Sequence, residues 1–113
     1  MQSTLILFLA AGMLFGEVAY GQTSMDPGNR KDGQAFALEV CTPCHVVSPK
    51  QLSPQRFSIA PSFEAIANAP TTTASGLRAF LSTSHPTMPN LILSRQEQRD
   101  VIEYIMSLDK RSP

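Results

Sequence analysis

Metal-binding side chains are scarce in this 113-residue sequence, which has two cysteines and two histidines. A structural zinc site commonly needs four cysteine or histidine ligands. Cys41, Cys44 and His45 lie together, but the other histidine, His85, follows 40 residues later without a second ligand pair. The shortage of ligands therefore argues against a zinc protein.

An excess of charge of one sign is also lacking, because nine basic residues balance nine acidic ones. Nucleic-acid binding usually requires a basic face, so this balance argues against a nucleic-acid partner. Long apolar runs are missing as well, with one exception near the N-terminus. Elsewhere, no stretch reaches the roughly 20 apolar residues that span a bilayer.

The exception is the uncharged apolar run of residues 4–16, which is followed by small residues at Ala19 and Gly21. This arrangement is typical of a secretory signal peptide, although no Lys or Arg precedes the run. We expect residues 1–21 to be this signal, with cleavage after Gly21 and export to the periplasm. An uncleaved segment would instead be a membrane anchor, and it would export the rest of the chain in the same way.

Both cysteines belong to one motif, Cys41-Thr42-Pro43-Cys44-His45. The C-x-x-C-H spacing is the attachment signature of c-type haem, in which two thiols bind the macrocycle and the histidine reaches the iron. A thioredoxin-like disulfide would need a nearby βαβ pattern, which is not found. A plain disulfide would close too small a loop to add much stability. The motif therefore predicts one haem c, attached through Cys41 and Cys44, with His45 as a metal ligand.

A haem held by one histidine has a second axial position, and its occupant separates electron transfer from binding or catalysis. Met88 is the favoured ligand, because Pro86 and Pro89 would stiffen the loop that presents it. Core filling is the commoner role of methionine. The other candidates are His85, Met25, Met106 and an open position.

The pattern of apolar residues predicts about four helices, no sheet and one domain. The helices are expected from about Lys31 to the motif, over residues 61–67, over residues 74–82, and from a cap at Ser94 to about residue 110. Ser94 and Glu97 form a capping box at the start of the last of these. Residues 22–30, rich in Gly, Pro and polar side chains, are interpreted as a flexible leader, and residues 31–113 as the folded domain.

Two expectations concern how the first predicted helix packs. Phe36 and Val40 are expected on its inner side, with Ala37 as a further candidate. Gly33 near its start is a weak helix former, so it is expected to permit the close approach of another helix.

The order of these features resembles the small class I cytochromes c of bacterial periplasms, over about residues 33–110. The resemblance rests on C-x-x-C-H after a first helix, Ala60-Pro61-Ser62-Phe63 in the middle, Met88-Pro89 in a loop, and the apolar last helix over residues 101–108. It implies an all-α, cytochrome c-like fold of about four short helices wrapped around one haem, with the first and last helices crossing. It also implies that the carbonyl of Pro61 accepts the second N–H of His45.

We therefore expect a periplasmic electron carrier rather than an enzyme, with its haem ligated by His45 and Met88. The alternatives are the haem subunit of a periplasmic dehydrogenase or oxidase complex and, less favoured, an open-iron gas sensor or peroxidase. The expected partners are redox proteins, either in transient contact or in a stable complex. Membrane attachment is expected only if the N-terminal segment is uncleaved.

Overall fold

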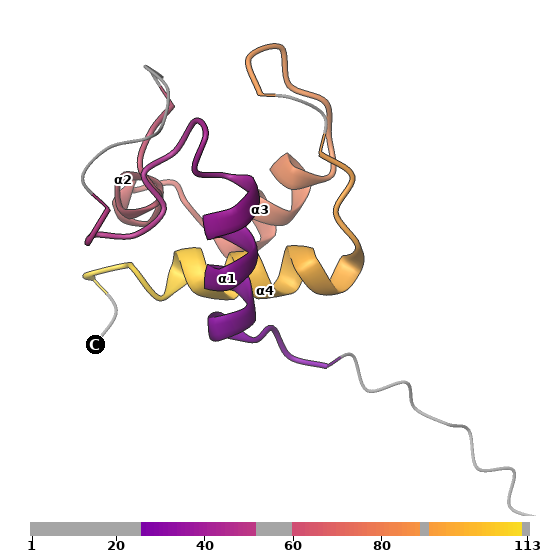
Figure 1. Cartoon of the computed structure of the whole chain (residues 1–113), viewed down its shortest axis with the longest axis horizontal. Helices are drawn as coiled ribbons and strands as arrows, with labels where there is room; N and C mark the ends of the chain where they lie inside the picture. The colour runs from indigo at the N-terminus through magenta and orange to yellow at the C-terminus, as the bar shows by residue number, and fades with distance from the viewer. Residues whose placement is uncertain (1–25, 52–59, 89–90, 112–113) are drawn as a thin grey trace, which may run out of the picture.

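The computed structural model describes residues 26–51, 60–88 and 91–111. These ranges contain four α-helices and no strand, which confirms the predicted all-α fold (Figure 1). The helices are α1 (Arg30–Val40), α2 (Phe63–Asn68), α3 (Ala74–Leu81) and α4 (Arg95–Met106). The predicted signal peptide of residues 1–21 lies outside the described residues. Among the helices that are described, none has the length and apolarity to cross a membrane.

Polar side chains define where the four helices begin. The N-cap residues are Asn29, Ser62, Thr73 and Ser94. At α4 the predicted capping box is present: the Ser94 hydroxyl accepts from the Glu97 amide at 3.2 Å, and the Glu97 carboxylate accepts from the Ser94 amide at 2.7 Å. Such caps satisfy amides that have no partner inside the helix. The C-terminal end of α4 was predicted less well, because the helix stops at Met106 and not near residue 110.

The first and last helices cross at Gly33, as Figure 1 shows for α1 and α4. A Cβ atom on Gly33 would lie 1.9 Å from the carbonyl oxygen of Asp100, so the prediction of a close approach at this glycine is confirmed. The buried side of α1 accordingly consists of Gly33 and Ala37. Phe36 and Val40, expected on this side, are only partly buried, because two backbones this close leave room for small residues alone.

Replacing Gly33 with alanine is expected to destabilise the fold by about 1–3 kcal/mol, the usual cost of inserting an atom into a packed contact. The added Cβ forces α1 and α4 apart, and the roughly 1 kcal/mol gained in helix propensity offsets only part of that cost. Urea unfolding followed by circular dichroism measures the change. Ala35→Gly, at an exposed position of the same helix, is the matched control and should cost about 1 kcal/mol. A stabilised Gly33→Ala protein would contradict the close packing.

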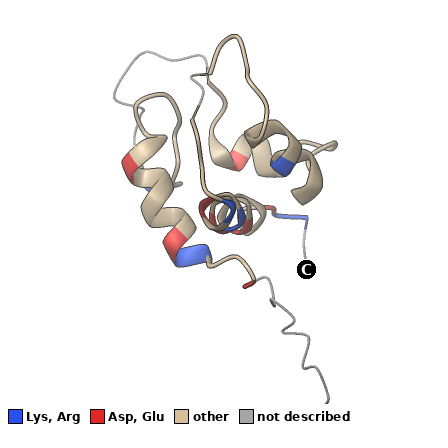
Figure 2. Cartoon of the chain, turned by 90° about the vertical axis from the view of Figure 1, so that its right-hand side faces the viewer, with Lys and Arg blue, Asp and Glu red and all other residues tan. Residues whose placement is uncertain are grey.

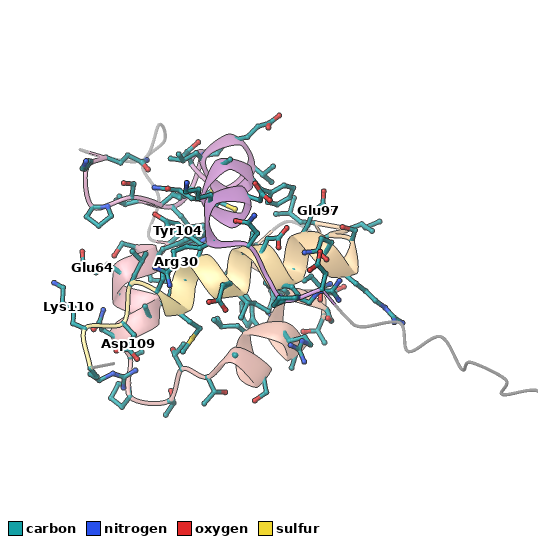
Figure 3. The ribbon with its side chains drawn as sticks, turned by 90° about the horizontal axis from the view of Figure 1, so that it is seen from below. Arg30, Glu64, Glu97, Tyr104, Asp109 and Lys110 are labelled. Atoms are coloured by element: carbon teal, nitrogen blue, oxygen red, sulfur yellow. The ribbon has the colours of Figure 1, made fainter. Side chains whose placement is uncertain are left out.

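Tyr104 of α4 joins the helices to the segment that follows the cysteine motif (Figure 3). Its ring is 4% exposed and lies 6.3 Å from that of Phe63 in α2, and its hydroxyl donates a hydrogen bond of 2.9 Å to the Val47 carbonyl. The buried cluster around it comprises Ala37, Val47, Phe63, Ala67, Val101, Tyr104 and Ile105. One core thus holds α1, α2 and α4 and fixes the start of the loop after the motif.

Asp100 is a buried carboxylate within the apolar side of α4, and it is 7% exposed. Its Oδ1 atom accepts a hydrogen bond of 2.7 Å from the Asn29 amide and one of 2.8 Å from the Gln96 side chain. A buried charge is tolerated when it is hydrogen-bonded in this way. Asp100 therefore ties the residue that caps α1 to α4. Both signs of charge occur on α1 and on α4 (Figure 2); α1 begins with Arg30 and Lys31 and continues with Asp32 and Glu39.

Candidate functional site

The cysteine motif forms a tight turn that continues from the C-terminal end of α1. The Cys41 amide donates to the Ala37 carbonyl at 2.8 Å, and the amides of Cys44 and His45 both donate to the Cys41 carbonyl, at 3.1 and 2.9 Å. The Thr42 hydroxyl adds a bond of 2.9 Å to the carbonyl of Leu38. These bonds set both sulfurs and the imidazole on one short, rigid piece of backbone.

Both thiols are free and partly buried, and their electrostatics bear on the dithiol alternative. Burial, with a smaller contribution from the charge of Cys44, raises the pKa of the Cys41 thiol to about 11. A catalytic redox pair needs the opposite shift, because the thiolate is the attacking form. The first cysteine of this motif therefore lacks the activation that a thioredoxin-like disulfide requires.

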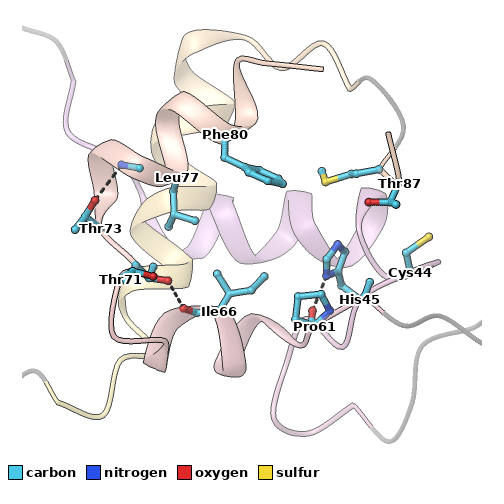
Figure 4. A pocket seen from close by; sticks show the side chains of 13 residues that line it. Cys44, His45, Pro61, Ile66, Thr71, Thr73, Leu77, Phe80 and Thr87 are labelled. Atoms are coloured by element: carbon cyan, nitrogen blue, oxygen red, sulfur yellow. Dashed lines mark hydrogen bonds between the residues drawn. The ribbon is translucent and has the colours of Figure 1, made fainter. Parts of the chain in front are cut away.

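The His45 ring is held by a hydrogen bond of 2.7 Å between its Nδ1 atom and the carbonyl oxygen of Pro61 (Figure 4). A carbonyl can only accept, so Nδ1 carries a proton, and in the neutral imidazole this leaves the lone pair on Nε2. The Phe63 ring, centred 5.4 Å away, packs on the imidazole at 59°. Histidine ligands of metals are usually oriented by such a second bond. The resemblance implied this contact at Pro61, and the structure contains it.

His45 borders the main cavity of the described part of the chain, which has a volume of about 560 Å³. Figure 4 shows Leu77 and Phe80 pointing into it from α3 and Ile66 from α2. No Lys, Arg, Asp or Glu is among the lining residues that the structure describes. These are Cys44, His45, Ala60, Pro61, Ile66, Thr71, Thr72, Thr73, Gly76, Leu77, Phe80, Thr87 and Met88. The cavity is thus an apolar space with thiol, imidazole and thioether groups in its walls.

The candidates for the second ligand occupy different places. Met88 lines the same cavity as His45, whereas His85 does not, and it borders a smaller pocket beside Phe80. Met106 lies at the end of α4 and is absent from the cavity wall. Met25 lies outside the described residues. The structure therefore brings His45, Cys44, Pro61 and Met88 of the predicted site residues to one cavity, with Cys41 one turn away.

Sequence reasoning missed the threonines of residues 71–73, which form one wall of the cavity. The Thr72 hydroxyl donates to the Ile66 carbonyl at 2.6 Å, and the Thr73 hydroxyl caps α3 by accepting from the Gly76 amide at 3.0 Å. Threonine before a helical run is a known start signal, so the cap could have been found from the sequence. Its position at the cavity could not.

Comparison with known proteins gives one informative match. Cytochrome c-552 of Bradyrhizobium diazoefficiens is 35% identical to this chain over 91 residues, which cover 80% of this chain and 86% of that protein. No family model matches the chain, and no solved structure does either. Identity at this level over most of the length of both proteins agrees with the C-x-x-C-H turn and the all-α fold. The chain belongs to the small c-type cytochromes.

Proposed function

We propose that the protein is an exported electron carrier that binds one haem c through Cys41 and Cys44, with His45 and Met88 as axial ligands. The observation that carries the proposal is the hydrogen bond of 2.7 Å between His45 Nδ1 and the Pro61 carbonyl. That bond directs the free lone pair of Nε2 to metal coordination. Met88 lines the same cavity, so a thioether is available as the partner ligand.

The residues around the cavity fit a haem. The volume of the cavity, about 560 Å³, lies within the range of roughly 300–1,000 Å³ that is usual for cofactor sites. Phe80 is 46% exposed while lining it, and a half-exposed phenylalanine in an apolar wall suits a large apolar ligand better than water. Cys44 lies in the wall, and Cys41 packs against the core one turn before it. The donor set, two thiols with imidazole and thioether, is that of a c-type haem.

Haem supplies one-electron exchange at its iron when it is bound. The Pro61 carbonyl keeps the imidazole of His45 in one tautomer and one orientation. As a ligand, the Met88 thioether would favour the reduced iron and raise the reduction potential. The apolar side chains of Ile66, Leu77 and Phe80 line the cavity and would limit the access of water to a bound haem, which would act in the same direction. With both His45 and Met88 holding the haem, oxygen would have no ready access to it, and this supports a carrier over a catalyst.

Export and partners complete the proposal. Export to the periplasm rests on the apolar segment of residues 4–16, which the structure does not describe. The partners are redox proteins in transient contact with an exposed haem edge.

Size-exclusion chromatography of a native extract tests this: elution as a small monomer supports the free carrier. Stable co-elution with a large redox protein would instead identify the haem subunit of a dehydrogenase or oxidase complex.

The central test uses protein matured in a host that exports it and attaches haem. The mass of the denatured chain should exceed that of the polypeptide by one haem, and the pyridine haemochrome spectrum should be that of a haem with two thioether bonds. The ferric protein should show the weak red absorption band of thioether-ligated iron and should bind carbon monoxide slowly when reduced. A chain without covalent haem, or one that takes up carbon monoxide at once, would overturn the proposal.

A further inference from the structure

His85 makes a close aromatic contact that the predicted function does not use. Its ring stacks on that of Phe80, with the ring centroids 3.5 Å apart and the planes at 25°. Phe80 belongs to the last turn of α3, and His85 belongs to the loop that leads to Met88. The stack therefore joins a loop to a helix.

The helix side of this contact is anchored by hydrogen bonds. The Ser82 hydroxyl shares its one proton between the Arg78 carbonyl at 2.8 Å and the Oε1 atom of Gln98 in α4 at 3.3 Å. The Thr83 hydroxyl donates to the Ala79 carbonyl at 3.1 Å. These bonds hold the C-terminal end of α3 in place and link it to α4. The backbone that carries Phe80 is therefore fixed on the helix side of the stack.

The loop side has few other attachments. Among the described residues, 84–88 make one hydrogen bond, between the Nε2 atom of His85 and the Thr83 hydroxyl at 3.4 Å. That bond is long and reaches only two residues back, so it holds the loop weakly. Within this part of the chain, the stack on Phe80 is the aromatic contact that joins the Met88 loop to α3.

Phe80 also faces the proposed ligand. It lines the main cavity together with Met88, and Phe80, His85 and Met88 all border the smaller pocket beside it. One phenylalanine ring therefore supports both the cavity wall and the histidine three residues before the thioether. A loop that moved off Phe80 would carry Met88 away with it.

We infer that His85 is a positioning residue: by stacking on Phe80 it holds the Met88 loop on α3 and keeps the thioether in place for the iron. The inference rests on the proposed function, because it needs Met88 as the axial ligand. His85 is not among the residues that line the main cavity, so we assign it a positioning role and not that of a ligand. Aromatic pairs of this kind are worth enough to shift an opening equilibrium roughly 2- to 10-fold.

The test follows the release of Met88 in the ferric holoprotein. Cyanide binds iron only after the thioether leaves, so its apparent affinity reports how often the loop opens. His85→Ala should increase that affinity roughly 2- to 10-fold and should lower the temperature at which the red band disappears. His85→Phe, which retains a stacking ring, should restore both values to those of the natural protein. His85→Leu, with similar apolar bulk but no ring, should behave like His85→Ala.

Ser84→Ala is the matched control, because Ser84 is an exposed residue of the same loop, and its replacement leaves both rings and the bonds at the end of α3 in place. Its cyanide affinity should be unchanged. Circular dichroism checks that each variant folds; if His85→Ala does not fold, the comparison of His85→Leu with His85→Phe decides. The inference would be overturned if His85→Leu and His85→Phe had equal cyanide affinities, or if His85→Ala matched the natural protein. If the natural protein still showed its red band, the proposed function would be unaffected. A natural protein without that band would overturn the proposed function itself.

Discussion

Replacing Met88 with alanine is expected to abolish the weak red band of the ferric protein and to lower the reduction potential by on the order of 0.1–0.3 V. The thioether stabilises the reduced iron, so its loss removes a preference that water or hydroxide does not replace. Met88 lines the cavity that His45 borders, and no second thioether is found in the described part of its wall. Absorption spectroscopy and protein-film voltammetry measure the two effects.

Met106→Ala is the matched control for this variant. Met106 is a partly buried methionine at the end of α4, outside the cavity. The variant therefore removes the same type of side chain as Met88→Ala but leaves the proposed site unchanged. Its red band and potential should match those of the natural protein. Carbon monoxide should bind rapidly to reduced Met88→Ala and slowly to reduced Met106→Ala. If Met88→Ala kept the band, another side chain would be the ligand and the proposed ligand set would be wrong.

Much of the fold could be predicted because its signals are local. The capping box of Ser94 and Glu97 needs only four consecutive residues, and both of its hydrogen bonds are present. The spacing of Cys41, Cys44 and His45 is equally local, and the structure makes it a turn bonded to the end of α1. Such signals depend on bond geometry within a single turn of chain, which the sequence alone determines.

What the sequence could not reveal depends on partners far along the chain. Periodicity predicted Phe36 and Val40 on the inner side of α1, with Ala37 as a further candidate; the crossing with α4 buries Ala37 beside Gly33 and leaves the two larger side chains only partly buried. Asp100 can be buried because its carboxylate accepts a hydrogen bond from the amide of Asn29, 71 residues earlier. Periodicity reports that a helix has an apolar side, whereas the residues that lie at the closest contact depend on the helix that crosses it.

The candidate site divides in the same way. The motif predicted His45 from its own residues, and the resemblance supplied the contact with Pro61, 16 residues later. The stack of His85 on Phe80 had no signal in the sequence, because neither spacing nor composition sets the direction of a loop that follows a helix. The chemistry was therefore easier to predict than the contacts that hold it in position.

Replacing both Cys41 and Cys44 with alanine is expected to remove covalent haem and most of the folded structure. The described part of α3 has no buried residue, and its apolar side chains Leu77 and Phe80 face the main cavity. Without a bound macrocycle these side chains lose their apolar partner, and a domain this small has little stability in reserve, about 5–15 kcal/mol at most. The mass of the denatured chain should equal that of the polypeptide, and the helical circular dichroism signal should fall sharply.

The two variants that lack only one cysteine distinguish the loss of haem attachment from the loss of folding. Cys41→Ala and Cys44→Ala each retain one thiol beside His45, so each should keep haem through a single thioether and remain helical, with a lower unfolding temperature. If the double variant stayed cooperatively folded without haem, the helices would be stable on their own core of Ala37, Val101 and Tyr104. The cavity would then be a preformed site into which haem is inserted. The expected loss of structure instead makes the cofactor part of the core, so that haem attachment and folding of α3 are one event.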